Sequence, residues 1–269
     1  MDLWDPIYRY YQINVFPKVR KFRGATRIKQ FLLSKAYNEK LQQTKRGFTL
    51  NFRGVNITAF KRDHFQEILG GNPIRGYTLH RDIKKGDTVI DAGAYPGIFT
   101  IYAAKKAGPE GKVIALEPDK ENMEAIKRNA SLNDNINIEF YQLGLWNEEG
   151  SVSFIEEGLK NSRITEFNDR EIESGGDIEV RPLDSLVEDE ELDSLDFIKM
   201  DIEGAEIEAI KGARRTIEGF RPFIAVASYH QRGTSKTAER VESLLESYGM
   251  TTSTNYDRHL TTYGHPQES

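Results

Sequence analysis

The chain has 269 residues, a net charge of −5 and no cysteine. This length suffices for one large domain with a full hydrophobic core. The lack of cysteine excludes disulfides and thiolate metal sites. The absence of disulfides fits a reducing cytoplasm. No apolar run approaches the roughly 20 residues needed to cross a bilayer. Asp2 and Asp5 stand where a secretory signal would carry basic residues, so we expect a cytoplasmic protein.

The beginning of the chain is basic and aromatic, unlike the more acidic remainder. Residues 6–38 contain eight Lys or Arg and no acid. Trp4, Ile7, Tyr8 and Tyr11 share one face of a predicted helix. Basic amphipathic helices bind membrane surfaces, whereas most amphipathic helices only cover a core. Peripheral membrane association and packing on the domain therefore both stay open. No nucleic-acid partner is expected, because no binding motif for one is present.

A β-hairpin and a short helix are predicted next. Alternating apolar residues over 48–60, interrupted by Arg53 and Gly54, predict two antiparallel strands. Residues 62–69 have the pattern of a short helix that ends at a glycine pair. The predicted domains are a basic helical extension at 1–45, a hairpin-and-helix cap at 46–85 and a main domain at 86–269.

The main domain opens with a strand, a glycine turn and a helix. Residues 88–90 form a short apolar run typical of a buried parallel strand. Asp91 follows this strand, and Gly93 and Gly97 bound the turn. Residues 98–107 continue with helical spacing. A turn of this kind, at the carboxyl end of a strand, is where open α/β sheets bind nucleotides.

Two acids at strand ends indicate the kind of cofactor. Residues 112–116 predict a second strand, and Glu117 follows it in a position to accept hydrogen bonds from two ribose hydroxyls. A dinucleotide-binding fold has glycine where this chain has Asp91, and a carboxylate there would repel a pyrophosphate. The same carboxylate would attract the sulfonium and ammonium groups of S-adenosylmethionine (SAM). The charge pattern therefore favours SAM over a nicotinamide dinucleotide.

Strands and helices alternate along the remaining chain, which predicts a parallel α/β sheet. Lys199 lies on the same strand face as Asp201, so it must find an acidic partner or reach solvent. Asp184 has the position of a helix N-cap. Helices are expected at 119–133, 204–212 and 235–248. Strands are expected at 136–145, 150–155, 197–201, 221–229, 250–255 and 259–263.

Two motifs carry a family resemblance. Residues 91–97, followed by Glu117, resemble motif I and the acidic strand of class I SAM-dependent methyltransferases. The segment FIKMDIEGAE at 197–206 resembles the hallmark of the FkbM-type methyltransferase family, and the likeness covers residues 86–230. It implies a Rossmann-like α/β sheet of strand order 3-2-1-4-5-7-6 with the last strand antiparallel. The family usually has Asn-Ile where this chain has Tyr95-Pro96, which puts the contact of that Asn in doubt.

The resemblance also implies the residues of the site. SAM is expected to bind at Asp91, Gly93, Ala94, Tyr95, Gly97, Glu117, Pro118, Gln142 and Leu143. The expected catalytic residues are Asp201, Glu203, Glu206 and His230. Acids at the start of a helix also complement its dipole, which is the structural alternative for Glu203 and Glu206. A lone histidine is likewise more often structural than catalytic. No metal ion is expected.

The resulting hypothesis is O-methylation of a hydroxyl on a sugar, a glycan or glycolipid, or a small natural product. In-line transfer from the sulfonium depends above all on positioning. Asp201, Glu203 or His230 would take the hydroxyl proton. A protein that keeps the fold and the SAM site without catalysis is the alternative. An NAD-dependent oxidoreductase is a less favoured alternative.

Overall fold

A computed structural model describes residues 41–44, 47–52, 55–59, 74–155, 163–164, 176–232, 235–256 and 259–266. The chain divides into two compact units, Met1–Asn72 and Pro73–Ser269. Of the predicted helical extension at 1–45, only residues 41–44 are described, and they form a strand instead of a helix. The predicted helix at 62–69 lies outside the described residues. Among the helices that are described, none has the length and apolar character needed to span a membrane.

The first unit contains a three-stranded antiparallel sheet. β2 (Gly47–Phe52) lies between β1 (Leu41–Thr44) and β3 (Val55–Ala59). Phe52 pairs with Val55, so the two strands of the predicted hairpin are confirmed. β1 was missed because its sequence, LQQT, lacks the apolar alternation on which strand prediction depends.

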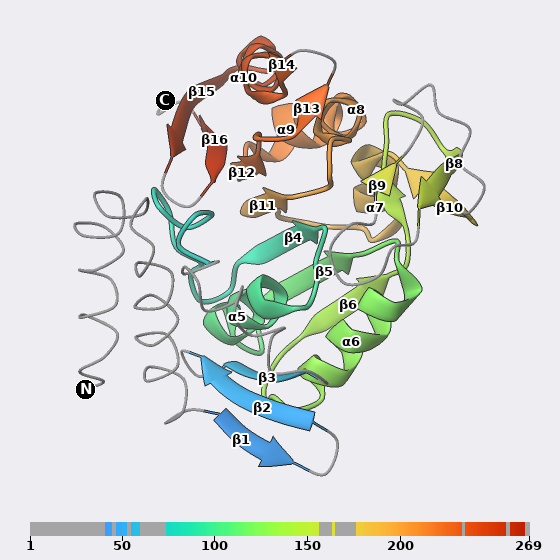
Figure 1. Cartoon of the computed structure of the whole chain (residues 1–269). Helices are drawn as coiled ribbons and strands as arrows, with labels where there is room; N and C mark the ends of the chain where they lie inside the picture. Colours follow the sequence, from blue (N-terminus) through green and yellow to red (C-terminus); the bar gives the residue numbers. More distant parts are fainter. Residues whose placement is uncertain are drawn as a thin grey trace, which may run out of the picture. The chain divides into compact units, whose positions relative to one another are not determined.

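A seven-stranded sheet forms the centre of the second unit. In chain order its strands are β4 (Thr88–Ala92), β5 (Lys112–Leu116), β6 (Ile138–Tyr141), β11 (Phe197–Met200), β12 (Phe223–Ala227), β15 (Met250–Tyr256) and β16 (Leu260–Pro266). Across the sheet their order is β15-β16-β12-β11-β4-β5-β6 (Figure 1). Neighbours from β6 to β12 pair in parallel, whereas β16 is antiparallel to β12 and β15. The predicted Rossmann-like order is therefore confirmed.

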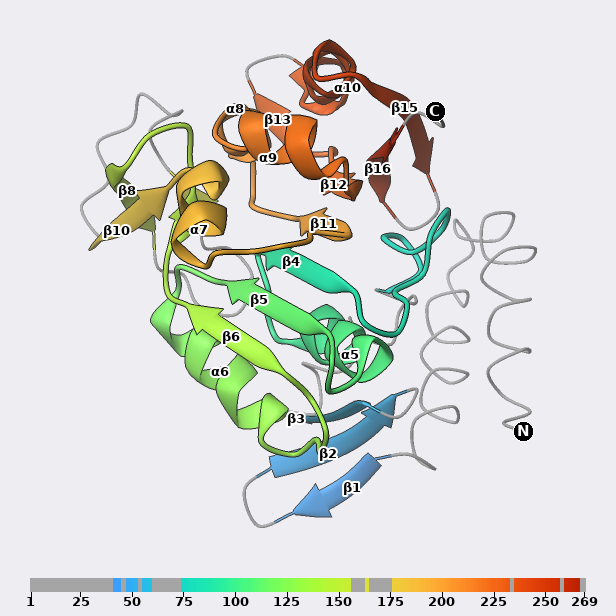
Figure 2. The same ribbon diagram turned by 180° about the vertical axis from the view of Figure 1, so that it is seen from behind.

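Helices cover both faces of this sheet, as Figure 2 shows from behind. They are α5 (Ile98–Ala107), α6 (Lys120–Ala130), α7 (Leu183–Asp189), α8 (Glu206–Lys211), α9 (Arg214–Phe220) and α10 (Ala238–Ser247). Successive side chains along each strand point to opposite faces of the sheet, so the hydrophobic core has one part on each face. Val89 belongs to the cluster that includes Phe99 of α5. Its neighbour Ile90 belongs to the cluster that includes Ile207 of α8 and Leu245 of α10.

A smaller sheet was not predicted as such. Its strand order is β7-β10-β8-β9. The bounds are β7 (Gly144–Leu145), β8 (Gly150–Ile155), β9 (Arg163–Ile164) and β10 (Gly176–Arg181), and a separate hairpin joins β13 (Gln231–Arg232) to β14 (Ser235–Lys236). The predicted strand at 150–155 is confirmed as β8. The predicted strand at 136–145 is instead divided between β6 and β7, which belong to different sheets, because β7 pairs with the distant β10.

Asp184 stabilises a helix other than the one that contains it. It lies within α7, whose N-cap is Pro182. The Asp184 carboxylate accepts hydrogen bonds from the backbone N–H of Arg215 at 3.0 Å and of Thr216 at 2.7 Å. These two N–H groups belong to the first turn of α9, where intrahelical partners are lacking. The predicted capping function is therefore found, but on a helix about 30 residues further along the chain.

Asp184→Ala should lower the free energy of unfolding by about 1–2 kcal/mol, since it leaves two N–H groups of α9 without their acceptor. Glu188→Ala is the matched control, because it removes an exposed acid from the same helix. It should change stability by no more than about 0.5 kcal/mol. Urea denaturation of both variants measures the difference, and equal stabilities would contradict the capping role.

Candidate functional site

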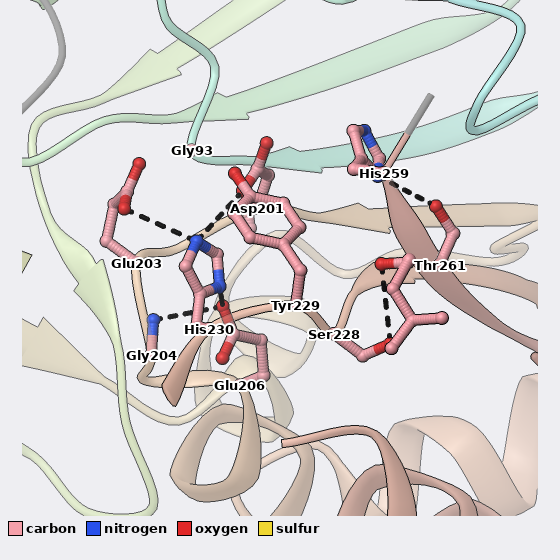
Figure 3. Close-up of polar contacts among 12 residues, drawn as sticks. Gly93, Asp201, Glu203, Gly204, Glu206, Ser228, Tyr229, His230, His259 and Thr261 are labelled. Carbon is pink, nitrogen blue, oxygen red and sulfur yellow. Dashed lines mark hydrogen bonds and ion pairs between the residues drawn. The ribbon is translucent and has the colours of Figure 1, made fainter. Parts of the chain in front are cut away.

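The ends of three adjacent strands bring the predicted site residues together. Gly93 directly follows β4, Asp201 directly follows β11, and His230 lies three residues after β12. The backbone N–H of Asp201 donates to the carbonyl of Ala92 at 3.0 Å. Figure 3 shows Gly93, Asp201 and His230 gathered at this edge. The topology therefore forms the crevice position at which open α/β sheets bind their ligands.

The turn after β4 depends on Gly93. Its φ is 75°, which L side chains rarely adopt, and a Cβ here would lie 1.9 Å from the carbonyl oxygen of Asp201. The backbone N–H groups of Gly93 and Ala94 donate to the carbonyl of Leu116 at 2.9 and 3.2 Å. The turn is thus packed tightly against β11 and hydrogen-bonded to the end of β5. Its last residue, Gly97, has a φ of 93° and precedes α5.

Asp91 is completely buried and pairs with Lys199. The Nζ of Lys199 lies 2.9 Å from Oδ1 of Asp91, and the Thr100 hydroxyl donates to Oδ2 at 2.6 Å. Lys199 also donates to the carbonyls of Ala92 and Gly93. The acidic partner that Lys199 was expected to need is therefore Asp91. Because this carboxylate is neutralised internally, its attraction for a cationic ligand is weaker than its sequence position implies, and its contact with SAM stays a prediction.

Lys199→Met should destabilise the protein by about 3–5 kcal/mol, because it leaves the Asp91 carboxylate buried without a countercharge. The double variant Lys199→Met/Asp91→Asn removes both charges and should recover part of that loss. Urea denaturation of the wild type, both single variants and the double variant completes the cycle. If the loss of stability in the double variant equals the sum of the losses in the two single variants, the two side chains are not energetically coupled.

Glu117 forms an acceptor site after β5. Only 5% of the residue is exposed. Its carboxylate accepts hydrogen bonds from the backbone N–H of Tyr95 at 3.3 Å and of Asp119 at 3.1 Å. Burial raises the pKa of Glu117 to about 7. Beside it, the buried Oδ1 of Asn122 has no hydrogen-bond partner among the described residues. This end of β5 therefore has unused capacity for hydroxyl donors such as a ribose diol.

The other predicted cofactor residues have different surroundings. Pro118 is half-buried beside Glu117, and Gln142 is exposed between β6 and β7. Leu143 is buried within the main hydrophobic core. The structure therefore gives the side chain of Leu143 a packing role, while the SAM contacts of these residues stay predictions.

An acidic cluster surrounds His230. Its Nε2 lies 3.3 Å from Oε2 of Glu203 and 3.7 Å from Oδ1 of Asp201. Its Nδ1 lies 2.8 Å from Oε1 of the fully buried Glu206 (Figure 3). Burial alone would lower the pKa of His230, but hydrogen bonding to Glu203 and Glu206 outweighs burial and raises the pKa to about 10. His230 is therefore positively charged near neutral pH.

The charge state of His230 affects its predicted role, because a protonated imidazole cannot accept a proton. Among the predicted bases, the geometry thus favours Asp201 and Glu203. Glu203 has a φ of 54° and lies before α8, which begins at Glu206. Glu203 and Glu206 therefore do not share a helical face. Glu206 instead turns inward, where its Oε1 also accepts the backbone N–H of Gly204 at 3.1 Å.

Three aromatic side chains adjoin the cluster, and none of them was among the predicted site residues. The Tyr77 hydroxyl donates to Oδ2 of Asp201 at 2.6 Å, and the Tyr229 hydroxyl donates to Oδ1 at 3.3 Å. The centroid of the His259 ring lies 5.1 Å from that of the Tyr77 ring and 5.3 Å from that of the Tyr229 ring. No local pattern pointed to Tyr77 or to His259. For Tyr229 the available signal was its position beside His230 at the end of a strand.

Known proteins resemble this chain in sequence. A family model described as the methyltransferase FkbM domain matches residues 91–251. Methyltransferase sdnD from Sordaria araneosa is 26% identical over 216 residues, which cover 63% of this chain and 82% of that protein. Methyltransferase 1 from Beauveria bassiana (strain ARSEF 2860) is 24% identical over 180 residues, which cover 60% of this chain and 71% of that protein.

A solved structure supports the fold. The crystal structure of methyltransferase FkbM from Methylobacillus flagellatus KT matches 70% of this chain with a TM-score of 0.50 and 23% identity. The match spans 46% of the Methylobacillus protein, so the chain corresponds to about half the length of that protein. At this level of identity the likeness concerns the fold alone.

Proposed function

Because this chain belongs to the FkbM methyltransferase family, we propose that it transfers a methyl group from SAM to a hydroxyl oxygen. The acceptor would be a sugar, a glycan or glycolipid, or a small natural product. The observation that carries the choice of oxygen is the cluster of Asp201, Glu203 and Glu206 around His230. A hydroxyl must lose its proton during methylation, and carboxylates at the site edge provide for that loss.

The residues at the sheet edge fit SAM. Glu117 and Asn122 offer acceptors for its ribose hydroxyls. Three carboxylates face a single imidazolium in the cluster around His230, and the remaining negative charge favours a cationic ligand. When bound, SAM supplies a methyl group whose bond to sulfur breaks, with the electron pair kept by sulfur, as the acceptor oxygen bonds to the methyl carbon.

Different members of the cluster take different roles in this proposal. The Glu203 side chain is 43% exposed, so its carboxylate can meet an acceptor and receive the hydroxyl proton. Asp201 is held by the hydroxyls of Tyr77 and Tyr229, which suits orientation of the acceptor and stabilisation of the positive charge that develops on its oxygen. Glu206 is fully buried and acts as a positioning residue for His230.

SAM affinity should rise with pH through about 7. The buried carboxyl of Glu117 has a pKa of about 7, so it is neutral below that pH and ionised above it. An ionised carboxylate accepts two hydroxyl hydrogen bonds better than a carboxylic acid. If binding requires the ionised form, calorimetric affinity at pH 5.5 should be up to about 30-fold weaker than at pH 8. Glu117→Gln should lose this dependence and keep only the part due to titration of SAM itself.

Methyl transfer itself is tested with a panel of hydroxylated acceptors, by following product mass and formation of S-adenosylhomocysteine. Glu203→Gln should lower kcat by about 10²–10⁴-fold with little change in SAM affinity, since it removes the proton acceptor. Glu239→Gln, an exposed acid on α10, is the matched control and should behave as wild type. SAM binding without transfer to any acceptor would favour a non-catalytic protein of this fold, and binding of NAD instead of SAM would contradict the proposal.

A further inference from the structure

Asp201, Glu203 and His230 have the arrangement of ligands around a metal ion. One atom from each, a carboxylate oxygen or a ring nitrogen, lies within 4.8 Å of the other two. The Nε2 of His230 is 3.3 Å from the Glu203 oxygen and 3.7 Å from the Asp201 oxygen. Two ligands held about 2.1 Å from one ion lie about 3 Å apart when they are at right angles. Small side-chain movements would therefore bring all three atoms to a common ion (Figure 3).

The surroundings of His230 provide a second, independent observation. Its side chain is only 9% exposed and points into the cluster, where its Nε2 faces the Glu203 and Asp201 oxygens that would be the other two ligands. Neither ring nitrogen makes a hydrogen bond of regular geometry among the described residues. The Nδ1 lies 2.8 Å from a Glu206 oxygen, a separation that is favourable only with a proton on Nδ1. Metal-binding histidines commonly present one nitrogen to a carboxylate in this way, which fixes the tautomer and leaves the other nitrogen for the ion. Because His230 is an imidazolium without an ion, metal binding would displace the proton on Nε2 to water.

We propose that Asp201, Glu203 and His230 bind one divalent metal ion, with Glu206 as the residue that orients His230. One imidazole and two carboxylates suit Mn²⁺, Fe²⁺ or Zn²⁺ better than Mg²⁺ or Ca²⁺, which prefer oxygen ligands alone. Three protein ligands leave coordination positions open for another molecule, as in catalytic metal sites. No metal had been expected from the sequence, because the ligands are not grouped in a known metal-binding motif.

The location of this metal site suggests its role, which rests on the proposed methyl transfer. An acceptor hydroxyl bound to the ion would have a lowered pKa. Its O–H bond would break with the proton passing to water, and the oxygen lone pair would form the bond to the methyl carbon. The C–S electron pair would stay on sulfur. With the ion in place, Asp201 and Glu203 serve as ligands, and the ion replaces Glu203 as the group that promotes proton loss.

Mn²⁺ binding to the full chain tests the site directly. Protein freed of metal with EDTA and then dialysed is titrated with Mn²⁺, and the electron paramagnetic resonance signal of the free ion reports binding. Wild type should bind one ion per chain. Glu203→Gln and Asp201→Asn should each weaken binding at least tenfold, and Glu206→Gln by about 10–100-fold through the orientation of His230. The exposed Glu239→Gln should leave it unchanged, which excludes a general effect of acidic charge.

Two results would overturn the metal site: no loss of free-ion signal up to about 1 mM Mn²⁺, or equal binding by wild type, Glu203→Gln and Asp201→Asn. Thermal unfolding confirms that each variant is folded, and Glu203→Gln carries the test most securely because that side chain is partly exposed. A parallel SAM titration separates the two proposals. SAM binding and methyl transfer without Mn²⁺ binding would reject the ion alone, whereas Mn²⁺ binding without SAM binding would reject the methyl transfer alone.

Discussion

The buried ion pair between Asp91 and Lys199 is the interaction on which the candidate site depends. It joins the two central strands β4 and β11 where they end, with 2.9 Å between the charged atoms. Lys199 also donates to the carbonyls of Ala92 and Gly93, so the same ammonium group holds the start of the glycine turn. Loss of either partner would leave an unpaired charge inside the core and would destabilise the fold at the strand ends that form the candidate site.

Above this neutral pair, the edge of the sheet keeps an excess of negative charge. His230 is surrounded by Asp201, Glu203 and Glu206, and a single proton cannot balance three carboxylates. Such a cluster opposes folding unless something cationic shares it. The two proposals identify cations that could do so at different points of the edge: the sulfonium and ammonium of SAM, and a divalent ion. Glu206 supports both proposals, because it fixes the imidazole from the buried side.

The division between rigid and accessible groups fits an enzyme of this family. Glu206 is fully buried and Asp201 is held by two tyrosine hydroxyls, whereas Glu203 extends toward solvent from a left-handed backbone conformation. The groups that set geometry are therefore packed, and the group proposed to meet an acceptor is open. Such an arrangement would suit the proposed in-line transfer, which depends on positioning.

The sequence by itself determined where the strands of the seven-stranded sheet lie along the chain, the glycine turn after β4 and the position of Glu117 after β5, because periodicity and turn chemistry are local properties. Only the tertiary structure decided which distant groups meet. Tyr77 reaches Asp201 across 124 positions of the chain, and Asp184 caps a helix that does not contain it. The charge of His230 was equally hidden, because a pKa depends on burial and on neighbouring carboxylates that local patterns do not specify.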